Sequence, residues 1–134
     1  MGDLDGLAIR YASASPDQEK LQAEVTEILE KECAAAKAAD VQTWNRYSDE
    51  FHLVFYRYCN NSRLAKSAER LRSGISIFSN QYCRETVIQT RIDEEHLAIF
   101  QAYKDGDIEK AVQMMKTHLN DSLNYALRFL PKTF

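Results

Sequence analysis

The sequence predicts an all-α fold: an antiparallel six-helix bundle in a single domain. Glycine and proline occur only 4 and 2 times in 134 residues, whereas residues of high helix propensity, such as alanine, leucine and glutamate, are abundant. Apolar side chains recur every three or four positions, which places them on one face of a helix, and no segment alternates as a strand does. The connections are short, so neighbouring helices are expected to be antiparallel.

A clear start signal separates the first two helices. The first is expected over residues 4–14, and we interpret it as truncated because it begins so close to the start of the chain. Ser15 and Gln18 then predict a capping box, and Pro16 suits the first helical position. The second helix is expected to run from there to about residue 38.

Four further helices follow, each with recognisable ends. Asp40 can cap the third helix, and the polar run Asn60–Ser62 is expected to end it. Gly106 can take the left-handed conformation that ends the fifth helix, and Asp107 can cap the sixth, which Pro131 ends. These helices are expected over residues 40–60, 63–82, 85–104 and 108–130.

Charge and composition narrow the class of protein. The formal net charge is −3, which argues against direct binding of this chain to a nucleic-acid backbone, since that requires a basic face. No apolar run is long enough to span a membrane. The odd number of cysteines, 3, shows no metal-binding spacing, so we expect reduced thiols in a cytoplasmic protein.

All three histidines of the chain lie in amphipathic helical segments. His52, His96 and His118 belong to the third, fifth and sixth expected helices, and each can face the interior of the bundle. Imidazole is the commonest protein ligand for transition metals. Three imidazoles that converge would form most of a site for a divalent metal ion, zinc or a similar ion, with a position left open.

Two other interpretations of these histidines stay open. Each histidine can be an ordinary core residue of a structural bundle, satisfied by one hydrogen bond. Alternatively, Asp49 and Asp93, each three residues before a histidine, suggest a metalloenzyme with a di-iron-like carboxylate site. Aspartate is shorter than the glutamate of such sites, and both residues are expected to fall toward the polar side. Nothing resembles a nucleophile elbow or an oxyanion hole, so we do not expect catalysis by the neighbouring Ser48 and His52. A binding domain that is not an enzyme is our leading expectation.

Three further side chains are candidates for the same site. Ser48 lies one turn before His52 on the inward face of the third helix, and Asp49 can also reach His52 from a position closer to solvent. Either residue is a possible fourth metal ligand. Among the arginines of the chain, Arg72 is our choice for a guanidinium that turns inward and pairs with a carboxylate of a bound effector.

The ordered set of these motifs resembles a known family. Residues 51–52 read Phe-His, residues 61–64 read Asn-Ser-Arg-Leu, residues 95–96 read Glu-His, residues 106–107 read Gly-Asp, and residues 115–119 read Met-x-x-His-Leu. In this order, and over residues 7–127, the chain resembles the FCD domain, the C-terminal effector-binding domain of GntR-family transcription regulators.

The resemblance implies a specific chemistry. It implies an antiparallel bundle in which three histidines, matched here by His52, His96 and His118, hold a divalent metal together with an acidic residue. A small organic acid or related metabolite would complete the coordination. It also implies a homodimer that binds DNA only through an N-terminal winged helix-turn-helix domain, which is absent from this chain.

This chain departs from the family pattern at one position. The family acid usually lies four residues before the first histidine, where this chain has Ser48. We therefore expect a weaker metal site that is more positive and attracts an acidic effector more strongly.

Overall fold

The computed structural model consists of six helices and, among residues 2–127, no strand. It describes the backbone of these residues and their side chains, except for the side chains of residues 75–82 and 126–127. The predicted all-α fold in a single domain is confirmed. The helices are α1 (Gly2–Ser13), α2 (Gln18–Lys37), α3 (Val41–Arg57), α4 (Ser62–Tyr82), α5 (Thr86–Lys104) and α6 (Ile108–Leu127).

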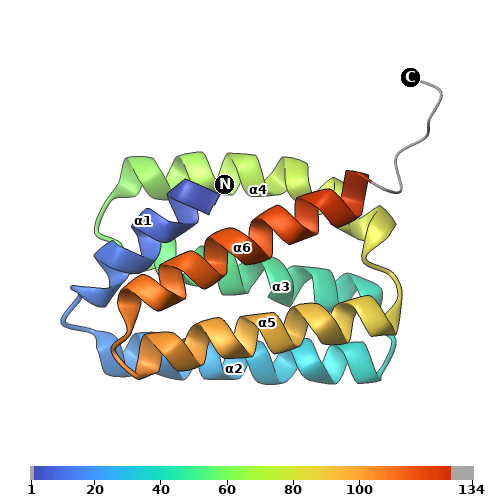
Figure 1. The fold of residues 1–134 in the computed structure, drawn as a ribbon, viewed down its shortest axis with the longest axis horizontal. Helices are drawn as coiled ribbons and strands as arrows, with labels where there is room; N and C mark the ends of the chain where they lie inside the picture. Colours follow the sequence, from blue (N-terminus) through green and yellow to red (C-terminus); the bar gives the residue numbers. More distant parts are fainter. Residues whose placement is uncertain (1, 128–134) are drawn as a thin grey trace.

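The helices form an antiparallel bundle (Figure 1). Along one edge α2 and α5 lie side by side and run in opposite directions, and α4 lies along the opposite edge. α3 packs against both α2 and α4, and the short α1 packs mainly against α6 and α3. Within the described residues, no helix combines the length and the apolar character that a membrane span requires.

Local capping explains most of the observed helix ends. The side chain of Asp40 accepts a hydrogen bond from the backbone N–H of Thr43 at 3.2 Å, as an N-cap does. Gly106 has a φ of +81° after α5, and Asp107 accepts a bond from the N–H of Lys110 at 3.3 Å at the start of α6. These predicted boundaries are confirmed.

The start of α2 differs from the prediction. The helix begins at Gln18 with Asp17 as N-cap, and the hydroxyl of Ser15 accepts a bond from the N–H of Asp17 instead of forming a capping box. The side-chain amide of Gln18 donates to the carbonyl of Ala12 at 2.6 Å and accepts a bond from the Tyr103 hydroxyl at 2.6 Å. The capping box is lost because this amide ties the end of α1 to α5.

The third helix ends earlier than expected. α3 stops at Arg57, because Asn60 takes a left-handed φ of +56° that a continuing helix excludes. Asn61 then accepts a bond from the N–H of Leu64 at 3.1 Å and caps α4. The predicted end of the last helix at residue 130 and Pro131 lie outside the described residues.

The interior of the bundle is divided into two apolar clusters by a polar centre. Along α2, Val25 and Ile28 face the larger cluster, Ala35 and Ala36 face a smaller one, and the fully buried Glu32 lies between them. The larger cluster also contains Ile9, Leu21, Phe55, Ile99, Tyr103, Ala111 and Met115. The helices thus bring buried polar groups together near the middle of the bundle.

Candidate metal centre

The polar centre contains all three histidines, which we call the histidine cluster. His52 on α3, His96 on α5 and His118 on α6 are 2%, 0% and 4% exposed. One ring nitrogen of each lies within 4.8 Å of the others. The Nε2 atoms of His96 and His118 are 3.0 Å apart, and the ring centroid of His52 lies 5.1 and 5.4 Å from theirs. The predicted convergence of three separate helices is therefore present.

Each imidazole contacts a carboxylate through its other nitrogen, Nδ1. An ionised carboxylate only accepts hydrogen bonds, so when the carboxylate is ionised the Nδ1 atom carries the proton and donates it. The three carboxylates come from α1, α2 and α5, and we call them the outer carboxylates. The pairs, with their N–O distances, are His52–Asp5 at 2.9 Å, His96–Glu32 at 2.9 Å and His118–Glu95 at 2.5 Å.

This arrangement leaves an Nε2 lone pair free on each ring. Two such lone pairs at the 3.0 Å separation of His96 and His118 repel one another unless a proton or a cation lies between them. Tetrahedral ligands about 2.0–2.1 Å from a zinc ion lie about 3.3 Å apart. Metal-binding histidines commonly donate their second ring N–H to a carboxylate. The donor set therefore fits a divalent metal ion.

Burial keeps the imidazoles neutral. It lowers the pKa of all three, to about 3 for His96 and well below the ordinary value for His52. The nearby guanidinium of Arg72 lowers each pKa further. Neutral imidazole is the form that binds metals.

Ser48 and Glu32 meet beside the histidine cluster. The Ser48 hydroxyl and the Asp93 carboxyl both hydrogen-bond the carboxyl of Glu32, and Trp44 Nε1 donates to Asp93 at 2.9 Å. Burial raises the pKa of Glu32 to about 7, and burial together with Glu32 raises that of Asp93 to about 8. Asp93 is only 4% exposed, so its expected place on the polar side is wrong: it faces inward toward Trp44.

The other two candidate side chains lie in different surroundings. Arg72 on α4 is 6% exposed, and among the described residues its Nε has no hydrogen-bond acceptor. Asp49 is partly exposed and does not belong to the group of converging ligand atoms found among the described residues. The structure thus places Arg72 in the interior and keeps Asp49 nearer to solvent.

Asp5 was not expected in the site. It is 1% exposed, it contacts His52, and it accepts a hydrogen bond from the Tyr56 hydroxyl. Burial raises the pKa of its carboxyl, although Arg72 and the bond from Tyr56 act in the opposite direction. α1 therefore contacts the histidine cluster through the carboxylate of Asp5.

The sequence does contain a signal for the two buried outer carboxylates. Glu32 lies four residues after Ile28, and Asp5 lies four residues before Ile9, so both acids occupy the apolar face of their helices. An acid at such a position requires a buried partner. These acids from other helices add carboxyl groups around the site that were not considered, and the expectation of a more positive site stays a prediction.

A groove on the surface is a weaker candidate for the functional site than the polar centre. It has a volume of about 320 Å³ and lies between α2 and α3. Its charges pair with one another, as in Arg57–Glu50 at 3.0 Å and Lys31–Glu27 at 2.8 Å. None of its lining residues belongs to the histidine cluster, so the polar centre is the candidate site.

Comparison with known families agrees with this geometry. The family model of the FCD domain matches residues 2–121, a range that includes the histidine cluster and all three outer carboxylates. Neither the curated proteins nor the solved structures gave a match. The chain therefore belongs to the FCD domain family, the C-terminal effector-binding domains of GntR-family transcription regulators.

Proposed function

We propose that this domain senses a small organic acid or a related metabolite at a divalent metal ion held by Nε2 of His52, His96 and His118. Two observations carry the proposal together: one ring nitrogen of each histidine lies within 4.8 Å of the others, and each Nδ1 contacts a carboxylate, which leaves Nε2 for a metal ion. When bound, the ion supplies a positive centre with open coordination positions.

The chain's own residues set the conditions for this site. Helices α3, α5 and α6 exclude water from the imidazoles, and the ring of Phe51 stacks on His96 with centroids 4.2 Å apart. Ser48 and Asp49 are possible fourth ligands. Because the Ser48 hydroxyl already bonds Glu32, we favour a protein ligand set of three histidines, with the remaining positions taken by water and the effector.

Arg72 is the proposed anchor for the effector's acid group. Its guanidinium is buried, and it acts electrostatically on the histidine cluster and on Asp5. A buried guanidinium with an unused N–H binds a carboxylate strongly, since a charge-assisted hydrogen bond gains strength away from water. In the proposed function the effector lies between α4 and the metal ion.

The proposed output is a change in helix arrangement within a homodimer. An effector that contacts Arg72 on α4 and a metal on α3, α5 and α6 binds most tightly to one arrangement of these helices. Its binding energy then favours that arrangement and, through it, one placement of attached DNA-binding domains. DNA binding is expected only through such an attached domain.

Titration tests the proposal. Zinc is titrated calorimetrically into the chelator-treated chain, with His96→Ala as the matched variant. We expect one zinc per chain for the wild type and none for the variant. A wild-type chain that binds no zinc, or a variant that binds as tightly, would contradict the metal site.

The effector is tested separately on the zinc-loaded chain. A panel of small mono-, di- and hydroxycarboxylic acids is screened by thermal shift, with Arg72→Lys and Arg72→Ala as variants. We expect a shift for at least one acid that weakens in Arg72→Lys and disappears in Arg72→Ala. An equal shift in all three chains would remove Arg72 from the effector site.

A further inference from the structure

Three carboxylates contact the histidine cluster from outside, and each lies on a different helix from the histidine that it contacts. Asp5 and Glu32 are 1% and 0% exposed, and they lie on α1 and α2, two of the three helices that contribute no histidine. Glu95 lies on α5 and its side chain is 27% exposed. Full burial of a carboxylate is costly unless its partners return the lost hydration.

Glu32 has the most complete set of contacts. Both of its oxygens lie within hydrogen-bond distance of His96 Nδ1, at 3.0 and 2.9 Å, and the Ser48 hydroxyl and Asp93 hold it from other sides. The other ring nitrogen of His96 faces His118. A shift of Glu32 would therefore change both the proton position and the orientation of the His96 ring.

From this geometry we infer that Asp5, Glu32 and Glu95 are the positioning residues of the metal centre: each fixes its histidine as the Nδ1–H tautomer and adds negative charge behind it. The inference rests on the proposed metal site. It goes beyond the three ligands because it makes metal affinity depend on α1 and α2. Loss of an outer partner of this kind typically weakens metal binding about 10–100-fold.

The exposure of each outer carboxylate predicts how much it contributes to metal affinity. Water screens the charge of Glu95, whose carboxylate also pairs with Arg91 on the same helix at 3.4 Å. Water does not reach Glu32 or Asp5, so the negative charge that either carboxylate carries when it is ionised is screened little from the imidazoles. The loss of affinity on substitution should be large for Glu32 and Asp5 and smallest for Glu95.

Two substitutions of Glu32 separate the effect of its charge from its effect on the orientation of His96. Glu32→Gln keeps an oxygen that accepts the Nδ1–H bond but removes the charge, whereas Glu32→Ala removes both. Glu27→Gln is the matched control, because Glu27 lies on the same helix, its side chain is 63% exposed, and it pairs only with Lys31 among the described ion pairs. Circular dichroism checks that each variant is folded, and the glutamine variant carries the test if the alanine variant is not.

Two measurements read out the result. Zinc affinity, from competition with a chromophoric chelator, should fall about 10-fold in Glu32→Gln and about 100-fold in Glu32→Ala, with no change in Glu27→Gln. Nitrogen NMR of the imidazoles in the zinc-free chain should show His96 as the Nδ1–H tautomer in the wild type and as a mixture in Glu32→Ala.

The outcomes distinguish this inference from the proposed function. Zinc affinity and tautomer unchanged in both Glu32 variants, with normal binding by the wild type, would overturn the positioning role alone. A wild-type chain that binds no zinc would overturn the metal site and this inference together. A Glu95→Gln variant that loses more affinity than Glu32→Gln would contradict the ordering by exposure.

Discussion

The larger apolar cluster and the polar centre, here called the apolar half and the polar half of the interior, are equally buried but differ in chemistry. In the larger apolar cluster, Leu21, Val25 and Ala111 are 0% exposed, and their burial contributes directly to stability through the hydrophobic effect. In the polar centre, Glu32 and His96 are also 0% exposed, yet burial of such groups opposes folding unless each finds a partner. The apolar half therefore stabilises the bundle, whereas the polar half is the metal-binding site of the proposed function.

The difference also separates two kinds of substitution. In the apolar half a truncated side chain leaves a cavity but no unpaired charge. In the polar centre it leaves a partner such as Glu32 or Asp5 buried without its hydrogen bond. Stability and metal affinity should accordingly respond to different residues.

Truncation in the apolar half should give the largest loss of stability. Leu21→Ala removes a fully buried side chain of α2, and we expect a loss of about 2–5 kcal/mol in the free energy of unfolding, measured by urea denaturation. Zinc affinity of the folded variant should stay unchanged. A variant that keeps its stability but loses zinc binding would show that the two halves are not separable.

Metal binding should stabilise the chain through the polar centre alone. At a free zinc concentration 100 times the dissociation constant, the gain is about 2.7 kcal/mol, visible as a higher melting temperature than in chelator. His118→Ala should lose this gain because it removes one of three converging nitrogens. An equal gain in His118→Ala would indicate that zinc binds elsewhere.

The stability of the metal-free chain should fall as pH rises from about 6.5 to 8. Burial raises the pKa of Glu32 to about 7 and, with Glu32, that of Asp93 to about 8. The folded chain therefore holds protons in this range that the unfolded chain has already lost, and deprotonation favours unfolding. Urea denaturation in chelator at several pH values measures the slope, and a rise in stability over this range would contradict the burial of these carboxyls.

At acidic pH the histidines change the stability of the metal-free chain in the opposite direction. Burial lowers the pKa of His96 to about 3 and also lowers those of His52 and His118, so below about pH 6.5 the unfolded chain binds protons that the folded chain does not. Between about pH 4.5 and 6.5 this effect and that of the carboxyls oppose each other. The metal-free chain should therefore be most stable at mildly acidic pH, whereas zinc affinity should rise with pH because binding requires neutral imidazoles.

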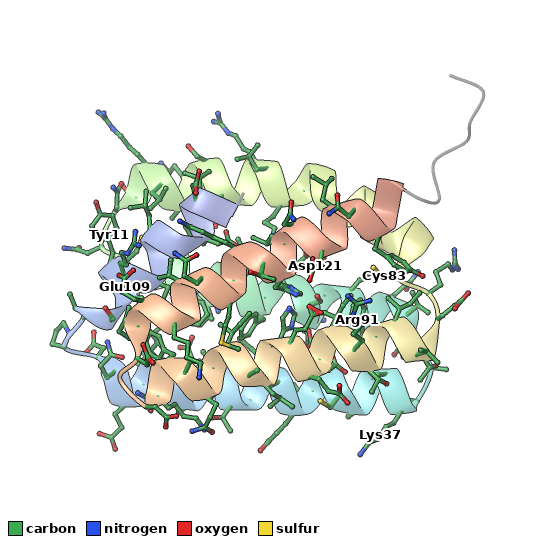
Figure 2. The ribbon with its side chains drawn as sticks, in the orientation of Figure 1. Tyr11, Lys37, Cys83, Arg91, Glu109 and Asp121 are labelled. Carbon is green, nitrogen blue, oxygen red and sulfur yellow. The ribbon has the colours of Figure 1, made fainter. Side chains whose placement is uncertain are left out.

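A surface ion pair should have the smallest effect. Arg10 on α1 makes two bonds of 2.9 Å to Glu109 at the start of α6, where Figure 2 shows Glu109 beside α1. Both side chains are exposed, at 40% and 68%, so water screens the pair and Arg10→Ala should leave stability almost unchanged and zinc affinity unchanged. A loss as large as that of Leu21→Ala would mean that this contact holds α1 in place.

Much of the fold could be predicted because its signals are local. The spacing of apolar residues gave six helices, and Asp40, Gly106 and Asp107 mark ends that depend on a few neighbouring residues. The start of α2 was missed because Gln18 is used in a contact with Tyr103, 85 positions away in the sequence. A local pattern cannot reveal such a competing partner.

The candidate site was predictable only in part, for the same reason. Helical periodicity places His52, His96 and His118 on inward faces, and their convergence follows once the helices pack. Periodicity does not say which helices become neighbours, so Asp5 and Glu32 could not be assigned to particular histidines. The inward position of Asp93 likewise depends on Trp44, which lies on another helix.

An anomalous difference map collected at the zinc absorption edge, from crystals of the chain grown with zinc, tests the central claim most directly. We expect one strong peak per chain, about 2.0–2.1 Å from Nε2 of His52, His96 and His118, with Asp5, Glu32 and Glu95 still on the Nδ1 side of the rings. A map without a peak between the three imidazoles, or one in which zinc lies only on surface carboxylates, would contradict the metal centre.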